Sequence, residues 1–171
     1  MCLRPAAALV AVLAAALACD AGLEPEPICA RGLVGLCGTI RFRGAIPDST
    51  ADVAVVAYAT FPQSCSDLFT FRPLLPPSVP YTDSVAAYSL TLAQGRYEWV
   101  VAVWRKTYPP LTFTVADTAV LRAAGHFRDP ADTTQPGAVT VTSGPAVGDV
   151  NFVVNFDSLR PVSYYFPCSA R

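Results

Sequence analysis

The chain has 171 residues, with 12 basic and 13 acidic side chains and a formal net charge of −1. This balance excludes the basic surface that nucleic-acid binding needs, so we expect no nucleic-acid partner. Its 16 prolines and 10 glycines, with recurrent Val, Thr, Tyr and Phe, indicate an all-β protein. The length suits one domain with a substantial core.

The first eighteen residues predict an export signal. Arg4 precedes an uncharged apolar run over residues 6–18, which is shorter than the roughly twenty residues of a membrane-spanning helix. Ala16 and Ala18 are the small residues that a signal peptidase reads before its cleavage point. We therefore expect residues 1–18 to be removed and the protein to be exported.

The next residue, Cys19, bears on where the exported protein stays. A cysteine directly after a short apolar run and small residues resembles the lipobox of bacterial lipoproteins, although Ala16 and Leu17 reverse the family's order. The resemblance implies a lipid on Cys19, a membrane partner through that anchor, and a periplasmic or outer-membrane location. Ordinary cleavage after Ala18 would instead give a secreted protein. Residues 19–32 are predicted to be a lipid-anchored or flexible tether.

Residues 33–171 are predicted to form a single β-sandwich domain. Apolar and polar residues alternate along short segments separated by turns, the pattern of half-buried strands. In the first strand, 38–43, Ile40 and Phe42 point inward, and we expect it to pair with the second strand, 52–61. Further strands are predicted at 86–92, 97–104, 111–115, 138–142 and 149–157, while 117–124 is either a helical turn or another strand.

The strand 97–104 is apolar on both faces, which predicts a central strand covered on both sides. If Trp104 emerges near a sheet edge instead, it and Tyr108 are candidate contacts for a sugar.

An insert at 62–84 interrupts the alternation with five prolines, so it is no central strand. It is either a loop packed over one end of the domain or an exposed recognition surface. On the second interpretation, Phe69 and Phe71 are candidate ligand contacts.

Four cysteines remain beyond Cys19, and their even number in an exported protein predicts two disulfides. Pairing of the first two strands would place Cys37 beside Cys65, which leaves Cys29 for Cys168. A local bridge between Cys29 and Cys37 is the open alternative. The spacing lacks a Cys-x-x-Cys pair, so we expect no metal site.

Three segments together carry a family resemblance. Residues 38–42 (GTIRF), 52–58 (DVAVVAY) and 88–104 (YSLTLAQGRYEWVVAVW) resemble the carboxypeptidase regulatory-like and transthyretin-like domains. The resemblance covers about residues 37–157. It implies a seven-stranded antiparallel sandwich, immunoglobulin-like or prealbumin-like, that serves envelope proteins as a spacer, stabiliser or binding module.

Enzymes related to these domains use residues that this chain lacks. The hydroxyisourate hydrolases need several histidines, and the intradiol dioxygenases need two, whereas His126 is the single histidine here. No serine lies in a Gly-x-Ser-x-Gly turn. We therefore expect no catalytic residues and no cofactor.

The sequence favours a noncatalytic, exported envelope lipoprotein domain that contacts an envelope protein or a glycan. The alternative is a carbohydrate-binding module that uses exposed aromatic rings, and a weaker one is an enzyme of unrecognised type.

Overall fold

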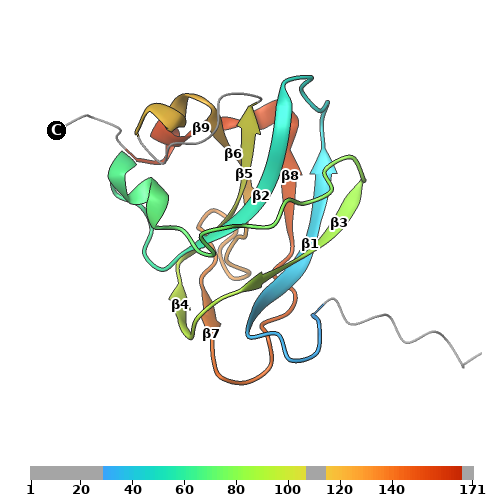
Figure 1. The fold of residues 1–171 in the computed structure, drawn as a ribbon, viewed down its shortest axis with the longest axis vertical. Coiled ribbons are helices and arrows are strands. Elements are labelled where there is room, and N and C mark those ends of the chain that lie inside the picture. Colours follow the sequence, from blue (N-terminus) through green and yellow to red (C-terminus); the bar gives the residue numbers. More distant parts are fainter. Residues whose placement is uncertain (1–28, 107–114, 167–171) are drawn as a thin grey trace, which may run out of the picture.

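A computed structural model describes residues 29–106 and 115–166, which are predominantly β structure (Figure 1). The strands of this part of the chain are β1 (Gly35–Arg43), β2 (Thr50–Tyr58), β3 (Val85–Thr91), β4 (Gly95–Tyr97), β5 (Trp99–Lys106), β6 (Leu121–His126), β7 (Val139–Val141), β8 (Phe152–Asn155) and β9 (Arg160–Pro161). Short 3-10 helices lie between them: η2 (Cys65–Thr70), η3 (Val115–Ala119), η4 (Phe156–Ser158) and η5 (Val162–Tyr164). The all-β prediction is confirmed.

Within the described residues, nine strands form three sheets, with orders β3-β1-β8, β2-β5-β6-β9 and β4-β7. This differs from seven antiparallel strands, because β1 and β8 pair in parallel and the predicted strand 97–104 is divided at Glu98. The Glu98 N–H donates to the Tyr58 carbonyl at 2.9 Å, where the chain leaves the small sheet and enters the four-stranded one.

The predicted pairing of the first two strands is wrong. β1 pairs with β3 and β8, whereas β2 pairs with β5 in another sheet. The connection between them begins at Gly44, whose φ of +82° is readily adopted by glycine, and it carries the chain across the core. The alternation of apolar and polar residues predicts which face of a strand is buried, but it does not predict which strand pairs with it.

The main core lies between the two larger sheets. It is built from alternate residues of their strands, as predicted, and its fully buried members include Ile40, Val55, Leu90, Val100 and Val154. Strand β5 is central in its sheet and buried on both faces, which confirms the prediction for 97–104.

The outer face of the four-stranded sheet carries a second apolar cluster, called here the outer cluster. Its sheet residues are Val56, Tyr58, Trp99, Val101, Leu121 and Ala123. The helix η2 covers one side through Leu68, and the Tyr58 hydroxyl donates to the Leu68 carbonyl at 2.7 Å. Val162 of η5 and Phe166 belong to the same cluster.

The insert 62–84 packs against the four-stranded sheet over much of its length, first through η2 and then along β2. Beyond η2 it follows the free edge of β2, where Ala57 and Arg72 exchange two backbone hydrogen bonds of 2.8 Å. Val79 donates to the Val53 carbonyl further along. Covering an edge strand in this way prevents its pairing with other chains.

The C-terminal half differs from prediction in detail. Residues 117–124 contain both expected forms, since η3 is followed by β6. Of the predicted strand 111–115, only Val115 is described, and it begins η3. Strand β8 is shorter than 149–157 because Asp149 has a φ of 59° and Asn155 caps η4. No helix within 29–106 and 115–166 has the length and apolar character needed to span a membrane.

Candidate functional site

Trp104, a possible ligand contact if it had emerged at a sheet edge, is a core residue. It is 5% exposed, and its Nε1 donates to Thr50 Oγ1 at 2.8 Å. The central position of β5 buries both of its faces, so Trp99 on the opposite face is buried as well. An aromatic platform on this strand is therefore unsupported. Tyr108 lies outside the described residues.

Phe69 and Phe71 are half-buried against the outer cluster. The Phe71 ring meets Tyr58 edge-on at 6.4 Å, so packing accounts for much of its surface. The exposed apolar part of the insert lies further along, at Leu74 and Leu75, which are 63% and 88% exposed.

The favoured cysteine pairing is wrong, because Cys29 bonds to Cys37. Cys37 would lie beside Cys65 only if β1 and β2 were neighbours, and they belong to different sheets. Cys65 is also disulfide-bonded. Cys168 and the predicted lipidation site Cys19 lie outside the described residues.

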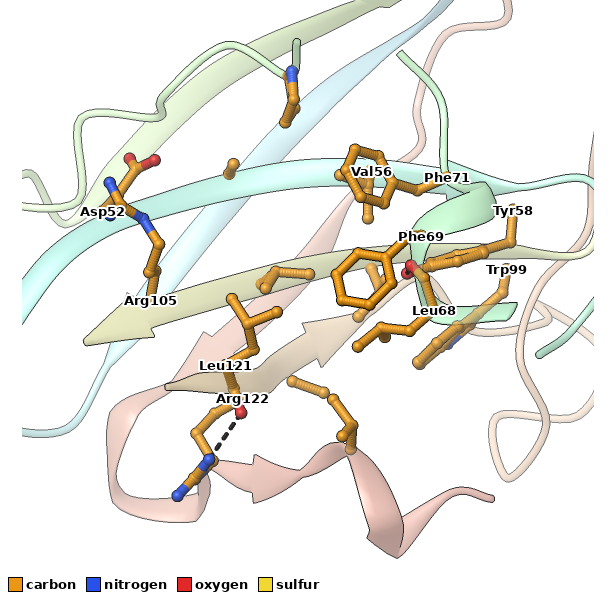
Figure 2. A pocket seen from close by; sticks show the side chains of 16 residues that line it. Asp52, Val56, Tyr58, Leu68, Phe69, Phe71, Trp99, Arg105, Leu121 and Arg122 are labelled. Carbon is orange, nitrogen blue, oxygen red and sulfur yellow. Dashed lines mark hydrogen bonds between the residues drawn. The ribbon is translucent and has the colours of Figure 1, made fainter. Parts of the chain in front are cut away.

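An apolar groove lies over the outer cluster, between η2, the sheet and η5 (Figure 2). Figure 2 shows Leu68, Phe69 and Trp99 gathered at one end and Asp52 and Arg105 at the other. The cavity volume of about 90 Å³ is well below the 300–1,000 Å³ typical of ligand sites. We interpret the groove as a packing gap, although the buried Trp99 Nε1 has no acceptor among the described residues.

A larger and more polar cleft lies between β6 and β8. Its volume is about 740 Å³, within the range of small-molecule sites. The polar and aromatic side chains lining it are His126, Phe127, Arg128, Asp129, Thr133, Thr134, Asn151, Phe152, Asn155, Ser158, Arg160, Tyr164 and Tyr165. These residues come from β6 and its following loop, from β8 with its flanks, and from the C-terminal segment.

The cleft exists because two sheet edges meet there without pairing. Among the described strands, β9 pairs with β6 only at Arg122 and Ala123, and β8 has a partner only in β1. At the closest approach, a Cβ added to Gly125 would lie 2.1 Å from the Val153 carbonyl oxygen. Beyond that contact, backbone groups of both edges are left without sheet partners and can bond a ligand or water.

An aromatic series forms one wall of the cleft. The Arg160 guanidinium carbon lies 4.6 Å from the centre of the Tyr164 ring. Tyr164 meets Tyr165 edge-on at 5.1 Å, and Tyr165 lies 5.3 Å from the buried Trp99 ring. Tyr164 itself is 60% exposed. The wall is thus continuous with the outer cluster, which holds the exposed ring in position.

Burial governs the charge state of the cleft. It lowers the pKa of His126 to about 4, with a smaller contribution from the positive charge of Arg128, so the imidazole is neutral at pH 7. Burial also raises the pKa of Tyr165, and the neighbouring Tyr164 adds to this effect. Arg160 and Arg128 act in the opposite direction on Tyr165, which shows that both guanidinium charges influence its hydroxyl.

No protein-family model, curated protein or solved structure matches the chain. The proposed function therefore depends on the chemistry of the cleft. Within the described residues, no three His, Cys, Asp or Glu side chains gather as a metal site would require. Asp129 and Asp132 instead accept the N–H groups of Ala131 and Thr134 in local turns.

Sequence reasoning missed the cleft. Its residues lie mostly outside the alternating segments from which the strands were predicted. The available signal was the aromatic pair Tyr164 and Tyr165 near the C-terminus, since such a pair must pack against something. It did not indicate which surface the pair would join.

Proposed function

We propose that this chain is a noncatalytic binding domain that holds an oligosaccharide in the cleft between β6 and β8. The observation that carries the proposal is the cleft itself, which combines a volume of about 740 Å³ with an exposed tyrosine ring among polar side chains. Binding sites of this size usually pair an apolar surface with a few convergent polar groups.

The lining suits the two chemical characters of a sugar. The exposed Tyr164 ring offers a flat surface for the apolar face of a pyranose, and its contacts with Arg160 and Tyr165 restrict its motion. Asn151 and Asn155 offer their amide N–H groups to sugar hydroxyls, whereas their Oδ1 atoms already accept from Thr39 and Asp157. The parts of the β6 and β8 edges that pair with no other described strand add backbone donors and acceptors.

A peptide strand inserted between β6 and β8 fits less well. Neighbouring strands need about 4.8 Å on each side, whereas Gly125 is already in contact with the Val153 carbonyl. A ligand that lies across the mouth of the cleft avoids this obstacle.

The surroundings of His126 support a noncatalytic role. Its ring neighbours are Trp99 and Tyr165, and no hydrogen bond within the described residues joins it to a carboxylate or hydroxyl. A histidine that acts as a general base usually has such an orienting partner.

We also propose that the two larger sheets are a divergent form of the carboxypeptidase regulatory-like sandwich, exported by residues 1–18 and anchored at Cys19. The shared core between those sheets supports the first point. The disulfide between Cys29 and Cys37 supports export, since such bonds persist in oxidising compartments.

The test is nuclear magnetic resonance titration of the purified, oxidised protein with a panel of neutral and acidic oligosaccharides. We expect amide shifts at cleft residues such as Asn155, and Tyr164→Ala should weaken binding about tenfold, the factor that about 1.4 kcal/mol of lost ring contact gives. Leu75→Ala removes another exposed apolar side chain and should leave binding unchanged. Absence of binding across the panel would reject the proposal.

A second candidate function is contact with an envelope protein through the insert. Leu74 and Leu75 lie adjacent on the surface between Pro73 and Pro76, which limit the freedom of the backbone. The Leu75→Ala variant separates the two functions, because it should weaken protein contact and spare sugar binding.

A further inference from the structure

We infer that the oligosaccharide is acidic, and that Arg128 and Arg160 bind a carboxylate on one of its sugar rings. This inference rests on the proposed function and specifies the substrate class of the same cleft. It is carried by two guanidinium groups from separate segments that line one cavity, neither of which has a carboxylate partner among residues 29–106 and 115–166.

The two arginines reach the cleft from different elements. Arg128 follows β6, and its Nη1 donates to the Thr133 carbonyl at 2.6 Å, which fixes the side chain. Arg160 begins β9 and lies over the Tyr164 ring at 4.6 Å. A guanidinium has five N–H donors, so each arginine retains donors for a ligand.

Neither arginine is neutralised within the described part of the chain. The ion pair found there joins Arg96 to Glu98 on β4 and its flank, not a residue of the cleft. Asp129 also lines the cleft, but its carboxylate accepts the Ala131 N–H at 2.8 Å in a local turn. With His126 neutral, the charged groups of the cleft sum to a positive value.

The convergence of two like charges favours a shared anion. Both guanidinium groups line the same cavity and carry the same charge, so they repel one another, and both also act on the pKa of Tyr165. A carboxylate between them would relieve that repulsion and accept charge-assisted hydrogen bonds, which are about twice as strong as neutral ones. The Tyr164 ring beside them would hold the sugar that carries the carboxylate.

The experiment compares three probes by isothermal titration calorimetry on the oxidised protein. The probes are trigalacturonate, its fully methyl-esterified form, which keeps the skeleton without the charge, and triglutamate, which keeps the charge without the sugar. We expect trigalacturonate to bind at least tenfold more tightly than its ester. Arg128→Gln and Arg160→Gln should each remove most of that difference, while Arg31→Gln, an exposed arginine outside the cleft, should not.

The outcomes separate this inference from the proposed function. Equal binding of the acid and its ester, or full binding of the acid by both cleft variants, overturns the acidic class and leaves oligosaccharide binding in place. Binding of triglutamate without either sugar overturns the proposed function and, with it, the acidic sugar. Absence of binding by all three probes overturns both.

Discussion

The pKa of His126 reflects the burial and the charge of the cleft. The imidazole is partly buried among aromatic rings and lies near the positive charge of Arg128. Both effects disfavour protonation, burial more than the charge. The cleft therefore keeps one charge state over the whole physiological pH range, and a ligand meets two cationic arginines rather than three cationic groups.

We expect the histidine to titrate with a pKa of about 4 in the folded protein. Because the chain has one histidine, its ring C–H resonance can be followed without assignment of the remaining protons. Arg128→Gln should raise this pKa modestly, since burial is the larger cause. A pKa at or above the ordinary value of about 6.5 would contradict the placement of His126 in the cleft wall.

The lowered pKa of His126 also predicts how the free energy of unfolding changes as the pH falls. Its folded pKa is lower than its unfolded one, so the unfolded chain binds the proton first. The contribution of His126 to stability is present above about pH 6.5 and decreases as the pH falls toward 4. Urea unfolding at several pH values should show this decrease, and His126→Asn should reduce its slope in the same interval.

At the scale of the strands, the cleft depends on the contact between β6 and β8. Gly125 provides it, because a Cβ there would overlap the Val153 carbonyl at 2.1 Å. Backbone atoms cannot move aside as a flexible side chain does, so the strands themselves must separate.

We therefore expect Gly125→Ala to destabilise the protein by about 2 kcal/mol or more, the upper part of the usual range for one substitution. Gly144→Ala is the matched control, since its nearest atom beyond the chain neighbours lies at 3.4 Å and is the Thr142 hydroxyl oxygen. Urea midpoints of the two variants provide the measurement. Equal midpoints would show that β6 and β8 are not in backbone contact.

The strands also show what the sequence can predict. Alternation located 38–43 and 86–92 and their buried faces, because a strand between water and a core must alternate. It missed the break at Glu98, where one backbone hydrogen bond to Tyr58 accompanies the change of sheet. The cleft was beyond prediction, since its residues come from two distant stretches of the chain, 123–134 and 151–165, that only strand order brings together.

At the scale of the whole molecule, the C-terminal segment connects the cleft to the outer cluster. Tyr164 and Tyr165 form a wall of the cleft, whereas Val162 and Phe166 pack on the sheet. The contacts that hold the C-terminal segment on the sheet therefore also position the Tyr164 ring, which we propose binds the sugar. Phe166 is 4% exposed and belongs to the same cluster as Cys65, which is disulfide-bonded.

We predict that Cys65 bonds to Cys168, two residues after Phe166, since two extended residues span about 7 Å. The loop closed by this bond has about 100 residues, for which the chain-entropy model gives about 4.7 kcal/mol, against about 2.5 kcal/mol for the eight-residue separation of Cys29 and Cys37. Replacing Cys65 and Cys168 by alanine should therefore lower the melting temperature more than the same change at Cys29 and Cys37. It should also weaken ligand binding, because the segment that carries Tyr164 loses its covalent attachment.

Peptide mapping without reductant would identify the bonds directly, and a bond from Cys65 to Cys19 would contradict both this connectivity and the proposed lipid anchor.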